Sequence, residues 1–241
     1  MKDFDKYRTI SPDYHYRRLD PSSLRDFSAP MRARFDDLMN KVASATRGTG
    51  KLLDVGCGDG VALFLLRKRF PKLELFGIDP MSEAITIAKE KVPNAHLEQG
   101  TADKLPFESD FFDLVISSDV IEHVSDADLM LREMKRVAQP EAAIIIGTPI
   151  KLTKNPLDHN HAQEFFPEDF MSMVARHFRE PKLFESHHLG YMLFYNAPTR
   201  SFFNFKYLIN LLFWIFGWNP FRRGRQNKIE LFAYQTVVCK K

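Results

Sequence analysis

Cysteine is scarce in this sequence, with Cys57 and Cys239 the only two among 241 residues. Two isolated cysteines do not provide the disulfide framework that stabilises small secreted proteins. A reducing compartment, the cytoplasm, is therefore the expected location. The segment Met1–Lys6 is charged and no apolar stretch follows it, so we also expect no signal peptide.

Long hydrophobic runs are also missing. A membrane-spanning helix needs about 20 apolar residues. In the most apolar region, residues 201–218, polar side chains interrupt the pattern at Asn204, Lys206 and Asn210, and the clean run covers only Leu211–Trp218. A spanning helix is therefore not expected. Three interpretations of this aromatic segment stay open: a helix in a membrane interface, a lid over an apolar substrate, or a dimer interface.

Charge is distributed unevenly along the chain. Residues 199–241 contain eight Lys or Arg and one acid, whereas the other 198 residues contain 26 basic and 30 acidic residues. A basic segment on a mildly acidic body fits an anionic lipid surface, a phosphorylated substrate or nucleic acid, although a solvated basic face explains it equally well. Peripheral membrane contact through residues 201–228 is one expectation that follows.

Short apolar runs alternate with amphipathic stretches from residue 51 onward. Such alternation predicts βαβ units, a parallel sheet and helices on both of its faces. The expected strands cover residues 51–55, 73–78, 95–99, 112–117, 142–148, 181–187 and 230–239, and the expected helices cover residues 61–69, 82–91, 127–137 and 167–178.

Two further segments complete the predicted organisation. Residues 22–47 carry apolar side chains at helical spacing, which predicts one or two helices and a helical N-terminal cap over residues 1–47. Residues 48–241 form the predicted α/β domain. Residues 190–228 form an aromatic-rich insertion before its last strand.

A glycine-rich turn follows the first expected strand, at residues 56–60. Side chains at Gly56 and Gly58 would prevent a ligand from approaching the backbone closely. Dinucleotide-binding folds use the spacing G-x-G-x-x-G, whereas the spacing here is G-x-G-x-G. The flanking carboxylates of Asp54 and Asp59 would repel a phosphate. They suit a ligand that carries an ammonium and a sulfonium group.

Polar positions also follow the next three strands. Asp79 ends the second strand and can accept hydrogen bonds from both hydroxyls of a ribose. Asp103, after the third strand, can accept from an exocyclic amino group, while Leu105 or Phe107 can cover a purine face. Residues 117–123 lie beside the crevice where open α/β sheets bind ligands.

Four segments, DVGCGDG (54–60), GIDP (77–80), GTADKLPF (100–107) and FDLVISSDVIEHV (112–124), together resemble the class I S-adenosylmethionine-dependent methyltransferases. The resemblance covers about residues 50–150. It is strongest to the branch that includes ubiquinone and menaquinone methyltransferases and many small-molecule methyltransferases. It implies an α/β, Rossmann-like, doubly wound seven-stranded sheet with an antiparallel last strand. It also implies S-adenosyl-L-methionine as methyl donor and S-adenosyl-L-homocysteine as product.

The resemblance also implies which residues meet the cofactor. Asp54 would anchor its amino group, and Gly56 and Gly58 would line its methionine and ribose parts. Asp79 would take the ribose hydroxyls. The remaining implied contacts are Ala102 and Asp103 at the adenine, Ser118 at the methionine end, and Pro80, His123 and Cys57, the last as a small filler of the loop and not as a nucleophile.

His159 and His161 are the candidate catalytic residues. They lie in the loop after the fifth strand, where the substrate should enter, and histidine suits proton transfer near neutral pH. A base is needed only for a hydroxyl, an acidic carbon or a protonated amine. Alternatively, one histidine braces the following helix. Zinc binding with Asp158 and Glu164 is disfavoured because no cysteine cluster or second histidine pair supports it, so no metal is expected.

The leading hypothesis is methyl transfer to a small-molecule or lipid-linked acceptor, at oxygen or carbon. An NAD(P)-dependent oxidoreductase and a non-catalytic cofactor-binding protein, with the insertion as its interaction surface, are the alternatives. Nucleic acid is not expected as a partner, because no NPPY-like or Pro-Cys motif appears. The oligomeric state is not predicted.

Overall fold

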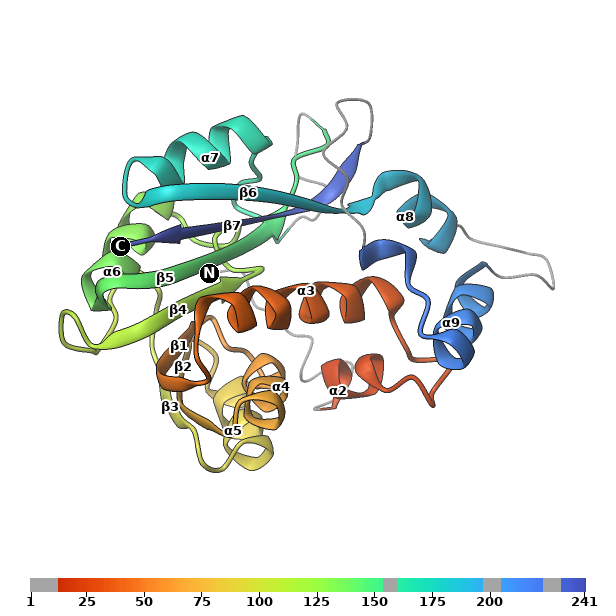
Figure 1. The fold of residues 1–241 in the computed structure, drawn as a ribbon, viewed down its shortest axis with the longest axis horizontal. Helices are drawn as coiled ribbons and strands as arrows, with labels where there is room; N and C mark the ends of the chain where they lie inside the picture. Colours follow the sequence, from red (N-terminus) through yellow and green to blue (C-terminus); the bar gives the residue numbers. More distant parts are fainter. Residues whose placement is uncertain (1–12, 154–159, 197–204, 223–230) are drawn as a thin grey trace.

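A seven-stranded sheet forms the centre of the molecule, with strands in the order β3-β2-β1-β4-β5-β7-β6 (Figure 1). The computed structural model describes residues 13–153, 160–196, 205–222 and 231–241. The strands are β1 Thr49–Val55, β2 Lys72–Asp79, β3 His96–Gln99, β4 Phe112–Ser118, β5 Ala138–Pro149, β6 Arg179–His188 and β7 Phe232–Lys240.

Strands β1 to β5 pair in parallel, and β7 runs antiparallel to both of its neighbours, β5 and β6. The predicted fold class, with an antiparallel last strand, is therefore confirmed. The chain runs outward from β1 through β2 to β3 on one side and from β4 to β5 on the other. The strand order therefore changes direction between β1 and β4. This change creates a crevice at the carboxyl ends of these two strands, where such sheets bind ligands.

Helices cover both faces of the sheet because its strands are apolar on both sides. Leu52 of β1 packs with α3 (Ala29–Ala45), α4 (Val61–Arg69) and α5 (Ser82–Lys91). The next residue, Leu53, packs with α6 (Ala127–Val137) and α7 (Pro167–Ala175) on the other face. The helices expected at 61–69, 82–91 and 127–137 have these bounds. The fifth strand begins earlier than expected, at Ala138, since it follows α6 without a loop.

The N-terminal cap contains α2 (Tyr14–Leu19) and α3. Helix α3 starts after Ser28, whose Oγ accepts a hydrogen bond from the Met31 N–H at 3.4 Å, and Pro30 lies in its first turn. The helical segment predicted from residue 22 therefore starts too early. Its beginning is set by the capping serine, and turns precede it.

The insertion packs against the cap instead of forming a separate lobe. Helices α8 (Leu189–Asn196) and α9 (Phe205–Phe216) and the 3₁₀ turn η1 (Pro220–Arg222) follow β6, and Figure 1 places α9 and η1 beside the start of α3. Their contact with the cap is an apolar cluster of Phe27, Ala29, Ala33, Tyr195, Ile209, Phe213 and Phe221.

Asn210 explains why a polar residue interrupts the aromatic run. Its side chain is fully buried, and its Nδ2 donates to the carbonyl oxygens of Leu24 and Phe27, both at 3.0 Å. Its Oδ1 lies 3.1 Å from the Tyr195 hydroxyl, which accepts from the Ala29 N–H at 3.2 Å. Asn210 thus satisfies backbone groups of the cap that would otherwise be buried without partners.

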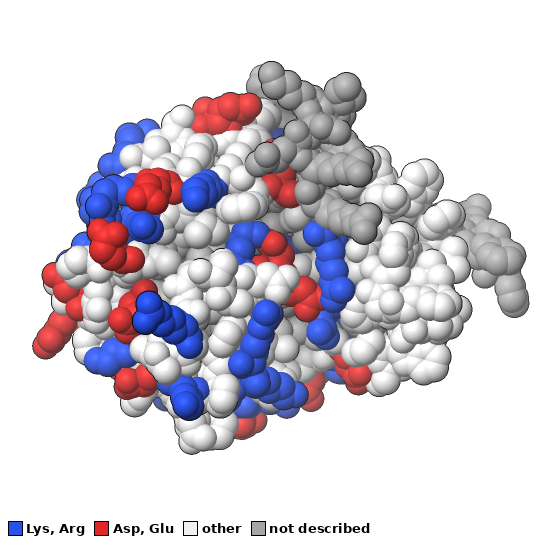
Figure 2. Space-filling view, in the orientation of Figure 1, with Lys and Arg blue, Asp and Glu red and all other residues white. Residues whose placement is uncertain are grey.

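The opposite face of α8 and α9 is exposed and apolar. In Figure 2 the surface over these helices is almost free of charged side chains. Within the described residues no helix is both long enough and apolar enough to cross a bilayer. The exposed large side chains here are Tyr191, Leu193, Phe194, Phe205, Tyr207, Leu208, Leu211, Trp214, Ile215, Phe216 and Trp218.

Candidate active site

Two adjoining cavities lie at the carboxyl ends of β1, β2 and β4. The larger, of about 560 Å³, lies between these strand ends and the N-terminal cap. The smaller, of about 240 Å³, lies between the ends of β2 and β3 and the turn after β4. His123 lines both of them. They occupy the crevice that the strand order creates.

The glycine turn is tied to the end of β2. The N–H groups of Gly56 and Cys57 both donate to the Ile78 carbonyl oxygen, at 2.8 and 3.0 Å. Gly56 has a φ of +79°, and a Cβ there would lie 2.2 Å from Cγ2 of Val120. The turn therefore requires glycine at this position for both conformational and steric reasons.

Asp79 holds the glycine turn and the start of α5 in place. Its Oδ2 accepts from the Gly58 N–H and its Oδ1 accepts from the Met81 N–H, both at 2.9 Å. Asp79 itself is not among the lining residues of either cavity, but Gly58, which it holds, lines the larger one, and the next residue, Pro80, lines the smaller one. A carboxylate has about four lone-pair sites, so it can still accept from the hydroxyls of a ligand.

Asp54 is buried at the end of β1 and lines the larger cavity. Burial, and secondly repulsion by Asp79, raises its pKa to about 7. Cys57 and Gly58 line the same cavity. Burial also raises the pKa of the Cys57 thiol well above its ordinary value, so this residue is a poor nucleophile.

The smaller cavity contains several of the predicted cofactor residues, namely Gly56, Pro80, Ala102, Asp103 and His123. Its apolar walls come from Ile78, Val120 and Val124. The sequence suggested Leu105 or Phe107 for this role, and that suggestion was wrong. Leu105 is buried in the core, and Phe107 packs at its edge against Phe112, with ring centroids 5.0 Å apart.

A buried polar network follows β4. Ser118 Oγ lies 2.8 Å from the Tyr234 hydroxyl, and Arg34 donates to Asp119 at 2.7 Å. Thr148 donates to Oε2 of Glu122 at 2.9 Å, while Oε1 of Glu122 is buried without a partner in the described structure. Burial and repulsion by Asp119 raise the pKa of Glu122. The network forms one wall of the larger cavity.

His161 lies in the larger cavity, where its Nδ1 is 2.7 Å from Oε1 of Glu164. Its ring contacts that of His123 edge-on, with centroids 5.0 Å apart, and His123 Nδ1 lies 3.1 Å from the Asn160 carbonyl oxygen. The other predicted catalytic residue, His159, lies outside the described residues.

The described residues that could hold a cation are not the set that the sequence pattern suggested. Within the described ranges, Glu122, His123 and His161 each offer one ligand atom, and these atoms lie within 4.8 Å of one another. The pattern in the loop had suggested Asp158, which lies outside the described residues, and Glu164 instead. The expectation that no metal binds stays a prediction.

Sequence reasoning did not select the cap residues that complete the larger cavity. His15 Nδ1 lies 2.8 Å from Asp59 Oδ2, and the Tyr16 hydroxyl donates to the Asp59 carbonyl oxygen at 3.0 Å. Tyr14, His15, Arg18, Met31, Arg34 and Phe35 line this cavity. The cap contains several tyrosines and arginines, and nothing in their spacing distinguishes those that face the cavity.

The strand order, the glycine turn and the acids at the strand ends define the class I methyltransferase fold. Residues 53–146 match the family model described as a methyltransferase domain. The match covers less than half of the chain, and this region is similar to a methyltransferase domain.

Curated relatives are similar to part of the chain. An uncharacterised methyltransferase of Schizosaccharomyces pombe is 35% identical over 103 residues, which are 38% of this chain and 37% of that protein. The ubiquinone biosynthesis O-methyltransferase of Azorhizobium caulinodans is 31% identical over 111 residues, 44% of this chain and 42% of the relative. The norajmaline N-methyltransferase of Rauvolfia serpentina is 36% identical over 101 residues, 39% of this chain and 34% of the relative. The matches span less than half the length of these relatives.

Solved structures share the fold over most of the chain. A methyltransferase from Thermotoga maritima superposes with a TM-score of 0.61 at 18% identity, over 95% of this chain and 99% of that one. Phosphoethanolamine N-methyltransferase 2 of Haemonchus contortus, solved with S-adenosyl-L-methionine, gives a TM-score of 0.61 at 14% identity over 98% of this chain and 59% of that one. At these identities the likeness concerns the fold.

Asp54→Asn should stabilise the protein at alkaline pH. The native state holds a proton on Asp54 up to a pKa of about 7, whereas an unfolded aspartate releases it near about 4. The contribution of this proton to the free energy of unfolding is fully present below pH 4 and is lost as pH rises through 7. The amide cannot ionise, so Tm at pH 8 should rise by roughly 4 °C or more, with a much smaller gain at pH 4.

Differential scanning calorimetry measures this effect, with Glu108→Gln, an exposed acid in the loop before β4, as a control that should not change Tm. A variant less stable than the wild type at pH 8 would show that the Asp54 carboxylate is stabilising in the free protein.

Proposed function

We propose that this protein transfers a methyl group from S-adenosyl-L-methionine to a small-molecule or lipid-linked acceptor, at oxygen or carbon. The observation that carries the proposal is the joining of two cavities around the glycine turn, one walled by buried acids and the other by apolar side chains. The family match of residues 53–146 supports the same function.

The residues present fit this cofactor. Asp54 and Asp59 offer carboxylates to an ammonium group, and Asp59 Oδ1 is buried without a partner in the described structure. Gly56 and Gly58 leave the backbone open to close approach, as their positive φ values allow. Asp79 would accept from ribose hydroxyls, while Val120 and Val124 would enclose the adenine beside Asp103. Ser118 and His123 complete the proposed set.

The cofactor supplies a methyl group already activated on a sulfonium, so the protein's main task is alignment. His161 is the proposed base. Its hydrogen bond with Glu164 orients the ring and stabilises the positive charge that forms when Nε2 takes a proton from the acceptor. Glu164 is itself buried, which strengthens this interaction.

Cofactor binding is the first expected outcome. S-adenosyl-L-homocysteine should bind with a Kd of about 1 to 100 µM, as is common for cofactor sites. Asp54→Asn should weaken binding at least about tenfold, because a charge-assisted hydrogen bond to the amino group is lost. Wild-type affinity should rise as pH rises through 7, when Asp54 ionises, and the variant should lack this dependence.

Isothermal titration calorimetry provides the measurement, and NADH and NADPH titrated in parallel test the oxidoreductase alternative. A folded protein that binds neither S-adenosyl-L-methionine nor its product would refute the proposed function. Binding without label transfer to any acceptor would favour the non-catalytic alternative.

His161→Gln should slow methyl transfer by about 10² to 10³-fold without changing the Kd of S-adenosyl-L-homocysteine. The assay follows labelled methyl transfer to separate small-molecule and lipid fractions of a cell extract, with and without EDTA because Glu122, His123 and His161 lie close together. His177→Gln is the matched control, since His177 lies 2.7 Å from Asp128 in another histidine–carboxylate pair that is absent from both cavity walls. Equal rates for wild type and His161→Gln would remove His161 as the base.

We also propose that the exposed face of α8 and α9 contacts a membrane surface. Trp214 is 58% exposed and Phe216 is 73% exposed, and tryptophan and phenylalanine favour the headgroup boundary. The basic residues Arg222, Arg223, Arg225 and Lys228 follow in the sequence and would attract anionic lipid. Contact here would bring a lipid-linked acceptor close to the cap.

Vesicle flotation tests this contact. The protein should float with vesicles of phosphatidylcholine and phosphatidylserine, and less with phosphatidylcholine alone. The double variant Trp214→Ser, Phe216→Ser should reduce the bound fraction at least about fivefold, since two interfacial side chains are lost. The control variant Phe166→Ser, which removes an exposed aromatic side chain before α7, should leave the bound fraction unchanged. Flotation unaffected by the double variant would show that this face is not the contact.

A further inference from the structure

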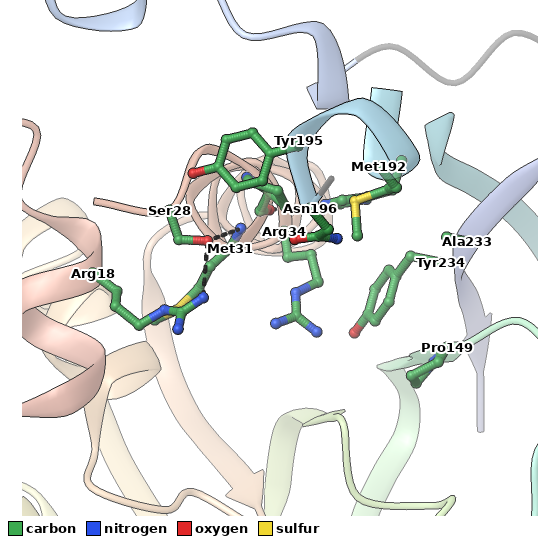
Figure 3. A pocket seen from close by; sticks show the side chains of 12 residues that line it. Arg18, Ser28, Met31, Arg34, Pro149, Met192, Tyr195, Asn196, Ala233 and Tyr234 are labelled. Atoms are coloured by element: carbon green, nitrogen blue, oxygen red, sulfur yellow. Dashed lines mark hydrogen bonds between the residues drawn. The ribbon is translucent and has the colours of Figure 1, made fainter. Parts of the chain in front are cut away.

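A third cavity, of about 260 Å³, adjoins the larger one on the side of the cap. The two share Arg18, Met31, Arg34 and Pro149 in their walls. Figure 3 shows Arg34 and Tyr234 side by side in this cavity, with Met192 and Asn196 of α8 beyond them. We expect an acceptor that enters from the side of the cap to occupy this space. The inference below therefore rests on the proposed function.

The two cavities differ in their acidic side chains. Arg18 and Arg34 line both, whereas Asp54, Asp59, Asp119 and Glu122 line only the larger one, mainly at the strand ends. Among the described residues, no carboxylate lines the third cavity. His187 also lines it, but burial lowers the pKa of this histidine to about 4, so it is neutral. A cationic cofactor fits the acidic side, and an anionic group fits the arginine side.

The two arginines are not equivalent. Arg34 donates to Asp119 at 2.7 Å and lies over the Tyr234 ring, 5.2 Å from its centroid, so its charge has a partner. Arg18 donates to the Tyr14 hydroxyl at 2.7 Å and to Ser28 Oγ at 3.3 Å, and both of these acceptors are neutral. Its Nε is buried and has no hydrogen-bond partner in the described part of the chain.

A buried donor without an acceptor destabilises a protein, by an amount that is larger for a charged group. A guanidinium that still has an unpaired N–H donor matches the planar, two-oxygen geometry of a carboxylate or phosphate. The walls around it are apolar, from Met31, Met192, Pro149 and Ala233. Such surroundings strengthen an ionic contact because they exclude water.

We propose that this cavity binds the anionic group of the methyl acceptor, a carboxylate or a phosphate, with Arg18 as its charge partner. The apolar walls would hold the adjacent carbon skeleton. Arg34, fixed by Asp119, would form the boundary with the cofactor cavity. The acceptor is thus an amphiphilic anion, which is consistent with either a small acid or the phosphate end of a lipid.

Three probes of similar shape test this site by calorimetric titration: benzoate, phenyl phosphate and the neutral benzamide. The wild type should bind one of the anions at least about tenfold more tightly than benzamide, and the better anion distinguishes carboxylate from phosphate. Arg18→Gln should remove this preference, and Arg18→Lys should restore part of it. Arg17→Gln is the matched control on α2, because Arg17 is 58% exposed and pairs with Asp26 outside the cavity.

Each titration is run with and without S-adenosyl-L-homocysteine, so that failure of cofactor binding is seen separately from failure of anion binding. For the wild type, a higher salt concentration should weaken the binding of the two anions and leave the binding of benzamide unchanged. This comparison tests the site even if Arg18→Gln does not fold. Equal binding of benzamide and the anions, or equal losses in Arg17→Gln and Arg18→Gln, would overturn the proposal. Absence of binding by all three probes would also overturn it.

Discussion

The hydrogen bonds that join the ends of β1 and β2 determine the geometry of the site. The Ile78 carbonyl accepts from two consecutive N–H groups of the glycine turn, and the Asp79 carboxylate accepts from Gly58. These contacts continue the parallel pairing of the two strands past their ends. Because the turn is fixed in this way, the acids on both strands lie at one crevice, and the pKa of Asp54 is raised first by burial and secondly by repulsion from Asp79.

That repulsion connects stability with binding. A buried acid beside a second acid opposes folding once it ionises, but it can stabilise a cation that enters the crevice. Asp59 and Glu122 each have one buried oxygen that finds no partner among the described residues, so the same excess of acceptors extends across the larger cavity. We interpret these unsatisfied groups as pre-arranged contacts for a cationic ligand, in keeping with the match of residues 53–146 to a methyltransferase domain.

The cap and the insertion contribute positive charge and exposed apolar surface on the side of the cavities away from the acidic strand ends. Asn210 and Tyr195 connect α8 and α9 to the start of α3, so the exposed aromatic face is anchored to the helix that carries Arg34. An acceptor held near Arg18 would therefore lie between the cofactor crevice and the aromatic face. The proposed membrane contact and the proposed anion site share this one assembly.

The resemblance to class I methyltransferases implied the antiparallel last strand, whereas the sequence by itself determined the parallel sheet and the glycine turn with its acids. These features arise from local patterns, since alternation of apolar residues specifies strands and helices, and a positive φ near a ligand requires glycine. Leu105 and Phe107 were assigned to the ligand because sequence position does not show which face of a loop is buried.

Only the tertiary structure determined which residues of the cap and of α8 lie together beside the cavities. Arg34 meets Asp119 across 85 residues, and Ala29 meets Tyr195 across 166. Contacts of this kind depend on how α2, α3 and α8 pack over the sheet, and no spacing in the chain encodes that packing. The cap had many arginines and tyrosines of equal promise, and burial alone distinguished Arg18, with its unsatisfied Nε, from the solvent-exposed Arg17 beside it.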